Sequence, residues 1–281
     1  MSITGFSRQK RVAAIHDISG FGRCSLTVVL PILSAAGIQC SVVPTAVLST
    51  HTGGLEGFTY RDLTDDILSF AIHWQQLGLS FDALYSGFLG SYQQVEIVTE
   101  FFHRFRTGDN LIMVDPVMAD NGELYQTFSN DFPAEMRKLC KKADIIVPNI
   151  TEASLLLEEP YCPGPYSKGY IETTLQKLAV LGSKQVVLTG VHFNDTEIGA
   201  AAYDSTGQVS YAMAKRVPGF YHGTGDIFAS VLLAELVKGH GLHMSTETAV
   251  NFVSEGIRRT YDAETDPRHG INFEAALGGL A

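Results

Sequence analysis

Short apolar runs alternate with longer amphipathic segments along most of the chain. Residues 11–17 (RVAAIHD), 81–87 (FDALYSG) and 110–116 (NLIMVDP) are apolar runs that end on polar residues or glycine, as buried strands do. Segments 62–78 and 91–108 place apolar residues at helical spacing and stop at glycine. This alternation predicts a mostly parallel β-sheet covered by helices on both faces.

The same pattern predicts the remaining elements. Strands are expected at 40–49, 144–149 and 184–190, and a hairpin at 197–215 turns around 205–207. Helices are expected at 25–37, 131–143, 151–159 and 169–182, with two more from about residues 224 and 244. Pro31 is expected to kink or split the first helix. No linker or composition break divides the chain, so we expect a single domain over residues 1–281.

Composition and charge narrow the class of protein. The 281 residues are 45% hydrophobic and carry a formal net charge of −10, with no long basic run, so nucleic acid and anionic membranes are poor partners. No apolar run reaches the roughly 18 residues of a membrane span, and VAAI (12–15) is too short for a secretion signal. Four separated cysteines without a C-x-x-C pair indicate reduced thiols, and we expect a cytoplasmic protein.

The stretch 221–230, YHGTGDIFAS, joins a glycine-rich turn to the start of an apolar helix. Backbone N–H groups at a helix start attract anions, phosphate above all. Asp226 adds a negative charge there, which makes chemical sense if its carboxylate meets the neutral group that attacks the phosphate. The simpler interpretation is that Thr224 and Asp226 only cap the helix.

Polar residues also follow other predicted strands. Asn149 and Glu152 lie three apart in PNITEA (148–153), a spacing that suits a hydrated Mg²⁺ and equally a helix cap. Asp115 ends a buried apolar strand, where a carboxylate needs a partner or a cation. Because carboxyl ends of parallel strands meet at one edge of the sheet, these groups are expected to share a cleft.

The N-terminal motif HDISGFGRCS (16–25) has the outline of a dinucleotide fingerprint but lacks its third glycine, since Ser25 stands there. No acidic residue closes the next strand either, so an NAD-dependent oxidoreductase is excluded. The SGFG turn instead brings backbone close to a small molecule, with Asp17 and Ser19 supplying polar groups. Thr45, expected at the end of the neighbouring strand, is a further candidate for this pocket.

Five motifs, taken in order, resemble one family. They are HDISGFG (16–22), SGFLGS (86–91), DPVMADNG (115–122), PNITEA (148–153) and GTGDIFAS (223–230), and HGINFEAAL (269–277) also fits. The set resembles the ribokinase-like small-molecule kinases, and most of all the pyridoxal (vitamin B6) kinase branch. The resemblance implies an α/β three-layer sandwich with ATP at the carboxyl edge of the sheet, and a homodimer.

The resemblance also implies a role for each candidate residue. Asp226 is the catalytic base for the acceptor hydroxyl, and Gly223, Thr224 and Gly225 form an anion hole. ATP and Mg²⁺ are held by Asp115, Asn149, Glu152 and Thr189, with Glu152 reaching Mg²⁺ through water and K⁺ as a further candidate cation. Asp17, Ser19 and Thr45, together with Asp226, contact the acceptor, a B6 vitamer phosphorylated on its 5′-hydroxymethyl group.

Alternatives within and outside this class remain open. The DxSG pattern also resembles hydroxymethylpyrimidine kinases of the thiamin pathway, although those tend to carry GTGC where this chain has GTGD. A sugar kinase belongs to the same class. A non-catalytic ligand sensor of the same fold is the alternative from a different class, and such a protein would be expected to lose Asp226 or the glycines.

Overall fold

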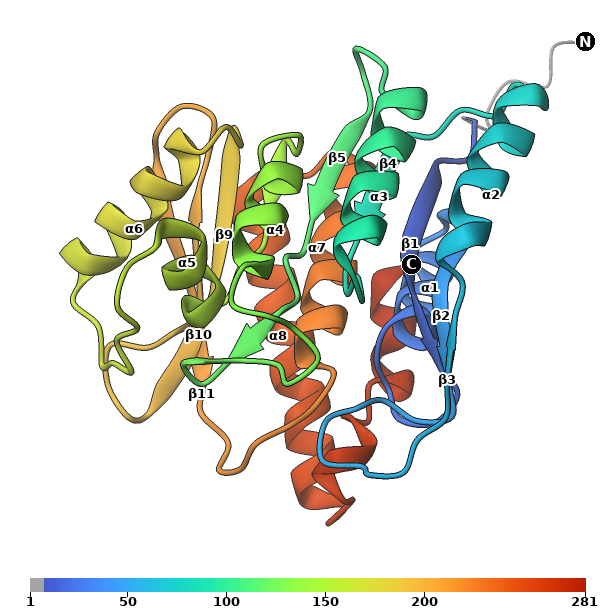
Figure 1. Cartoon of the computed structure of the whole chain (residues 1–281). Coiled ribbons are helices and arrows are strands. Elements are labelled where there is room, and N and C mark those ends of the chain that lie inside the picture. Colours follow the sequence, from blue (N-terminus) through green and yellow to red (C-terminus); the bar gives the residue numbers. More distant parts are fainter. Residues whose placement is uncertain (1–7) are drawn as a thin grey trace, which may run out of the picture.

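A nine-stranded sheet runs through the centre of the molecule (Figure 1). The computed structural model describes residues 8–281; the first seven residues, which begin the stretch considered for a secretion signal, lie outside it. The strand order is β11-β10-β9-β8-β5-β4-β1-β2-β3. The strands are β1 (Arg11–Ser19), β2 (Gln39–Leu48), β3 (Tyr60–Asp62), β4 (Ala83–Ser86), β5 (Leu111–Val114), β8 (Ile145–Ile146), β9 (Gln185–Val191), β10 (Glu197–Tyr203) and β11 (Val209–Lys215).

Six neighbouring strands, from β2 through β1, β4, β5 and β8 to β9, are parallel. The outer strands β3, β10 and β11 pair antiparallel. A separate two-stranded sheet is formed by β6 (Ala119–Asp120) and β7 (Glu123–Leu124). The predicted fold class, a mostly parallel α/β sheet, is confirmed.

Helices cover both faces of the sheet (Figure 1). One apolar core lies under α2 (Thr64–Gln76), α3 (Tyr92–Phe105), α4 (Phe132–Cys140), α5 (Ile150–Leu157) and α6 (Lys168–Val180). The other lies under α1 (Leu26–Ala35), α7 (Thr224–Lys238), α8 (Leu242–Asp262) and the 3₁₀ segment η2 (Glu274–Leu280). A further 3₁₀ segment, η1 (Pro267–His269), buries no residue. Ala13 and Ile15 of β1 enter the first core and Val12 and Ala14 the second, because successive strand residues point to opposite faces.

Three local predictions need correction. Thr45 does not end its strand, because β2 continues to Leu48 and pairs there with β3. Asp62 belongs to β3 rather than to the following helix, and its carboxylate accepts a hydrogen bond of 2.7 Å from the N–H of Thr64, where α2 begins. Helix α1 continues through Pro31 without splitting.

Within residues 8–281, no helix combines the length and apolar character needed to cross a membrane.

The core under α3 gives a stability prediction. Phe101 is fully buried and its ring packs 4.8 Å from Phe105 and 6.2 Å from Trp74, measured between ring centroids. We expect Phe101→Ala to lower the free energy of unfolding by about 3–5 kcal/mol, because it removes a large apolar contact and leaves a cavity. Ile72→Ala, on the exposed side of α2, should change it by less than about 1 kcal/mol. Urea unfolding of the two variants is the measurement, and equal losses would contradict this assignment of the core.

Candidate active site

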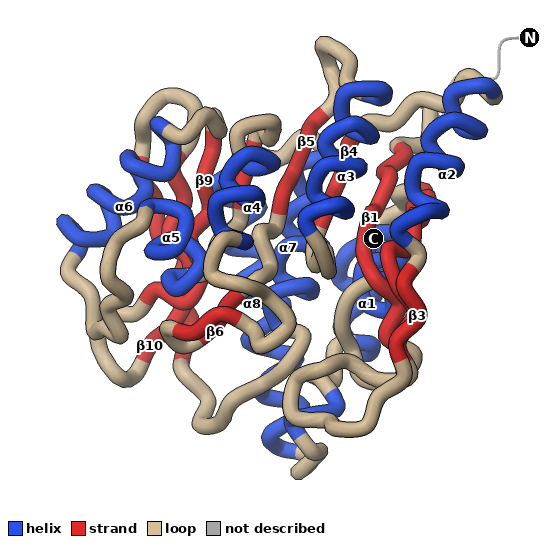
Figure 2. The backbone as a smooth tube through the Cα atoms, viewed as in Figure 1, coloured by secondary structure: helices blue, strands red, loops and turns tan. Residues whose placement is uncertain are grey.

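The carboxyl ends of the parallel strands bring several predicted site residues to one edge of the sheet. The chain leaves the strands there into the loops drawn tan at the lower edge of Figure 2. Asp115 directly follows β5, and Asn149 follows β8. Asn149 pairs in parallel with Thr189 of β9, whose N–H donates to the carbonyl of Pro148 at 3.0 Å. Asp115, Asn149 and Thr189 therefore line one side of the same edge.

The GTGD turn begins α7. Gly223 is the N-cap residue with φ 75°, and a Cβ there would meet the carbonyl oxygen of Arg23 at 1.9 Å, so only glycine fits. Gly225 faces open space, with no atom within 4 Å of the position a Cβ would take. Thr224 does not cap the helix; its hydroxyl donates to the carbonyl of Tyr221 at 3.4 Å. The first N–H groups of α7 have no partner within the helix, as at every helix start.

Asp226 lies in the first turn of α7, as predicted, and reaches the loop after β1. Its Oδ2 accepts a hydrogen bond of 2.9 Å from the backbone N–H of Ser25. The residue as a whole is only partly buried. Burial in the site, followed by the nearby charge of Asp17, nevertheless raises the pKa of Asp226 to about 7.

Asp17 and Ser19 lie at the end of β1 and form a buried cluster with Ser25. The Ser25 hydroxyl donates to Oδ1 of Asp17 at 2.6 Å, and the Ser19 hydroxyl donates to Oδ2 at 3.1 Å. Asp17 is 4% exposed, and burial raises its pKa while the two serine hydrogen bonds lower it. Both carboxylate oxygens are thus already engaged inside the protein.

Asn149 and Glu152 form a capping box at the start of α5. The Asn149 side chain accepts from the N–H of Glu152, and Oε2 of Glu152 accepts from the N–H of Asn149, both at 2.9 Å. Oε1 of Glu152 accepts from the N–H of Met118 at 3.1 Å. The helix cap is therefore present in the structure. A ligand that bound Glu152 would contact a carboxylate that already accepts these hydrogen bonds.

Thr45 is almost fully buried inside β2, and its hydroxyl has no hydrogen-bond partner among the described residues. Its carbonyl is held by the side-chain amide of Gln94 at 3.1 Å and by the N–H of Leu63 at 3.0 Å. Thr45 lies on the strand next to the one that carries Asp17. The structure therefore places the two residues near each other, although Thr45 is not at the end of β2.

Negative charge dominates this edge. None of the ion pairs within residues 8–281 involves Asp17, Asp115, Glu152 or Asp226. Burial, then the charges of Glu152 and Asp226, raise the pKa of Asp115 well above its usual range. Burial also raises the pKa of Glu152. Carboxylates in this state are poised to accept either protons or a cation.

The residues fit a hydrated Mg²⁺ better than a fully protein-bound metal. Among residues 8–281, no three His, Cys, Asp or Glu side chains form a ready ligand cluster. Asp115 is 5% exposed, and its carboxylate accepts no hydrogen bond from the described side chains or loops. Mg²⁺ keeps several waters and is usually held by one or two carboxylates together with substrate phosphates. Asp115, with Glu152 beside it, offers that kind of donor set.

Two further residues, Ser25 and His51, make contacts at this end of the site. Ser25 was noticed only as the replacement of a third glycine, yet it contacts both Asp17 and Asp226. His51 packs over Gly22, accepts from the N–H of Gly53 at 3.0 Å through Nδ1, and lies 2.6 Å from the carbonyl of Arg268 through Nε2. The φ of Ser25 is 52°, a conformation usually left to glycine, and the available sequence signal was that Ser25 stands at the third glycine position of the fingerprint outline.

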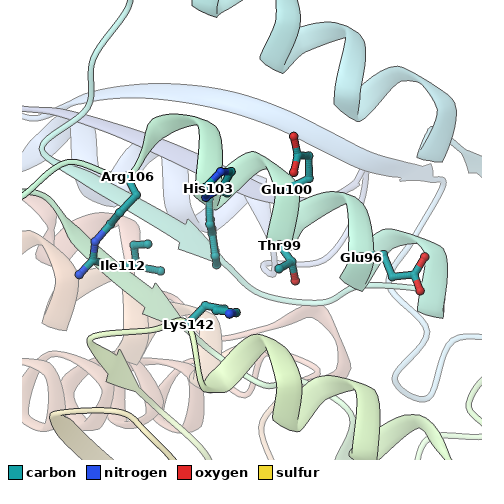
Figure 3. A pocket seen from close by; sticks show the side chains of 8 residues that line it. Glu96, Thr99, Glu100, His103, Arg106, Ile112 and Lys142 are labelled. Atoms are coloured by element: carbon teal, nitrogen blue, oxygen red, sulfur yellow. The ribbon is translucent and has the colours of Figure 1, made fainter.

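A separate surface groove lies away from these residues (Figure 3). It has a volume of about 370 Å³ and runs along α3 toward the beginning of β5, with Arg106, Ile112 and Lys142 at one end. Glu96 and Glu100 line its other part, so its charges are mixed. None of the predicted site residues borders it, and it adds nothing to the chemistry at the carboxyl edge.

Comparison with known proteins gives a family match over most of the chain. The family model described as phosphomethylpyrimidine kinase matches residues 30–271. A solved structure from Bacteroides thetaiotaomicron, described as a "putative phosphomethylpyrimidine kinase", is 41% identical, with a TM-score of 0.94, over 99% of this chain and 96% of that one. A second crystal form of it contains pyridoxal and is 42% identical, with a TM-score of 0.93, over 97% and 96%. The pyridoxal kinase of Lactobacillus plantarum is 34% identical, with a TM-score of 0.88, over 98% and 97%.

The curated relatives include enzymes of thiamine biosynthesis and kinases of vitamin B6. A chloroplastic thiamine biosynthetic bifunctional enzyme of Arabidopsis thaliana is 26% identical over 83% of this chain, which spans only 44% of that enzyme. The hydroxymethylpyrimidine/phosphomethylpyrimidine kinase of Bacillus subtilis is 27% identical over 77% of each chain. The pyridoxine/pyridoxal/pyridoxamine kinase of Bordetella avium is 25% identical over 90% of this chain and 86% of its own.

The contact between Gly223 and Arg23 yields a prediction. Gly223→Ala should lower the free energy of unfolding by at least about 1–3 kcal/mol, because the new Cβ meets a carbonyl oxygen and the backbone keeps a positive φ. Gly225→Ala, two residues on and facing open space, is the matched control and should leave stability unchanged or slightly raised. Thermal unfolding compares the two, and a Gly223→Ala protein as stable as the wild type would show that the turn is not held against Arg23.

Proposed function

The chain belongs to the phosphomethylpyrimidine kinase family, and from that membership we propose that it is an ATP-dependent kinase that phosphorylates the hydroxymethyl group of a B6 vitamer. The products would be pyridoxal 5′-phosphate and the phosphates of pyridoxine and pyridoxamine. The observation that carries the proposal is the position of Asp226, a partly buried carboxylate in the first turn of α7 directly after the glycine turn.

The position of Asp226 and its pKa both suit a general base in this reaction. Phosphoryl transfer depends mainly on positioning and on stabilising charge around a loose transition state. The N–H groups at Gly223, Thr224 and Gly225 would stabilise the transferring phosphoryl group. Asp226 would orient the acceptor hydroxyl and take its proton late, and a pKa of about 7 lets it do so near neutral pH.

The ends of β5, β8 and β9 would hold the nucleotide. Asp115 and Glu152 would hold Mg²⁺, Glu152 through water, while Asn149 and Thr189 lie where the phosphates of ATP would pass. Mg²⁺, when bound, would offset the charge of the phosphates and of the surrounding carboxylates. The use of ATP is supported by related pyridoxal kinases that were crystallised with ADP.

The choice of a B6 vitamer is supported by the pyridoxal in the 42%-identical structure and by the 34%-identical pyridoxal kinase. Asp17, Ser19 and Thr45 lie at the proposed acceptor end, and the buried Thr45 hydroxyl has no hydrogen-bond partner among the described residues. A hydroxymethylpyrimidine kinase is the second candidate, supported by the family model and by the relative from Bacillus subtilis. A non-catalytic sensor is disfavoured by the presence of Asp226 and both glycines.

Further properties implied by the resemblance stay predictions. They are a single kinase domain over residues 1–281, a homodimer, a cytoplasmic location and a response to K⁺.

Asp226→Asn tests the role of the base. We expect turnover to fall by about 10²–10⁴-fold while the KM for ATP changes little, because the amide keeps the shape but cannot accept the proton. Steady-state ADP release is the measurement, and the unfolding temperature of the variant serves as the control for folding. Near-normal turnover would remove Asp226 from the mechanism.

A panel of acceptors tests the substrate. Purified protein is given ATP, Mg²⁺ and, in parallel, pyridoxal, pyridoxine, pyridoxamine, hydroxymethylpyrimidine and ribose, and ADP release is followed. We expect the highest kcat/KM with a B6 vitamer. A higher kcat/KM with hydroxymethylpyrimidine would reject the B6 assignment and leave the role of Asp226 intact, whereas no ADP release with any acceptor would favour the sensor.

A further inference from the structure

One residue, Ser25, joins the two carboxylates at the acceptor end of the site. Its hydroxyl donates to Oδ1 of Asp17 at 2.6 Å, and its backbone N–H donates to Oδ2 of Asp226 at 2.9 Å. Asp17 lies in β1, near its end, and Asp226 belongs to α7, 201 residues beyond Ser25 in the sequence. Ser25 is therefore the direct connection between the end of β1 and the carboxylate assigned as the base.

The backbone of Ser25 is in a conformation that its partners must hold. Its φ of 52° and ψ of −139° are uncommon for a residue with a side chain. Ser25 is also the N-cap of α1, and its carbonyl accepts from the N–H groups of Val28 and Val29, both at 3.0 Å. Helix α1 fixes one side of Ser25, and the bond from its hydroxyl to Asp17 fixes the direction in which its N–H points.

Asp17 itself is poorly placed to contact an acceptor. It is 4% exposed, and its two carboxylate oxygens accept from Ser25 and Ser19. By contrast, the residue Asp226 is only partly buried, and its carboxylate receives only the single hydrogen bond from Ser25 among the described side chains and loops. A change at Asp17 would thus reach the acceptor through Ser25 and Asp226.

We propose that Asp17 is a positioning residue, which orients Asp226 through Ser25 toward the acceptor hydroxyl. The inference rests on the proposed function, because it gives Asp226 the role of the base. It replaces the direct acceptor contact that the sequence indicated for Asp17. The two roles differ in what they change: lost orientation lowers kcat, whereas a lost acceptor contact raises the KM for the acceptor.

A double-mutant cycle separates these roles. Asp17→Ala and Ser25→Ala should each lower kcat by about 10- to 100-fold and leave the acceptor KM within about twofold. The double variant should be within about twofold of the worse single variant, because both changes break the same connection. Asp17→Asn should be at least about tenfold more active than Asp17→Ala, since its amide oxygen can still accept from Ser25. Ser34→Ala, exposed on α1, is the control and should match the wild type.

A second measurement does not need activity. Amide hydrogen exchange at residue 25, followed by NMR, should be about tenfold faster in Asp17→Ala than in the wild type if Asp17 holds this N–H against Asp226. Unchanged exchange, an acceptor KM raised tenfold in Asp17→Ala at constant kcat, or multiplying losses in the double variant would each overturn the positioning role. A wild type that phosphorylates no acceptor would reject the proposed function, and the exchange rate would still decide whether Asp17 orients Ser25.

Discussion

Four carboxylates share one edge of the sheet with no basic side chain paired to them among the described residues, and this crowding of like charge is the constraint that the site must satisfy. Asp17, Asp115 and Glu152 are almost fully buried, and Asp226 is partly so. A buried carboxylate is tolerated when it is protonated, hydrogen-bonded or matched by a cation. Here Glu152 is bound by two backbone N–H groups, Asp17 by two serines and Asp226 by one N–H, while Asp115 has none of these. Asp115 is thus the buried carboxylate with the least compensation for its charge, and it lies beside the place where ATP-bound Mg²⁺ is proposed to bind.

Sequence patterns predicted the parts of the fold that depend on local order. Apolar periodicity and glycine stops located the strands, the helices and their alternation, and strand ends brought Asp115, Asn149 and Thr189 together as expected. Short features were missed, because β6 and β7 have two residues each and carry no periodic signal. Thr45 was expected at the end of its strand, but β2 runs on to Leu48, where its last residues pair with β3.

The sequence predicted which positions belong to the site, but it did not predict which of these residues contact one another. Motif order led to the family, and the family relationship is confirmed by the match over residues 30–271. The roles of the individual residues stay predictions. Ser25 could not be recognised from sequence, because its importance comes from a bond to a residue 201 positions away. Asn149 and Glu152 show the opposite case, in which local spacing correctly indicated a cap and left open whether the same residues serve a ligand.

The succession of strands bears on how one fold can serve two vitamins. From β1 the chain adds β2 on one side and then crosses back to add β4 on the other, so its winding direction reverses between β1 and β4. Such a reversal opens a crevice at the carboxyl edge of an α/β sheet. Asp17 lies near the end of β1 and Gly87 follows β4, the strands on either side of the reversal, whereas Asp115 and Asn149 follow β5 and β8 and Thr189 lies in β9, strands that are added later on one side only. Under the proposed function, Asp17, Ser19 and Thr45 at the acceptor end all come from the first third of the chain. Substitutions around β1 and β2 would then change the choice of acceptor without altering the later strands that are proposed to hold the nucleotide.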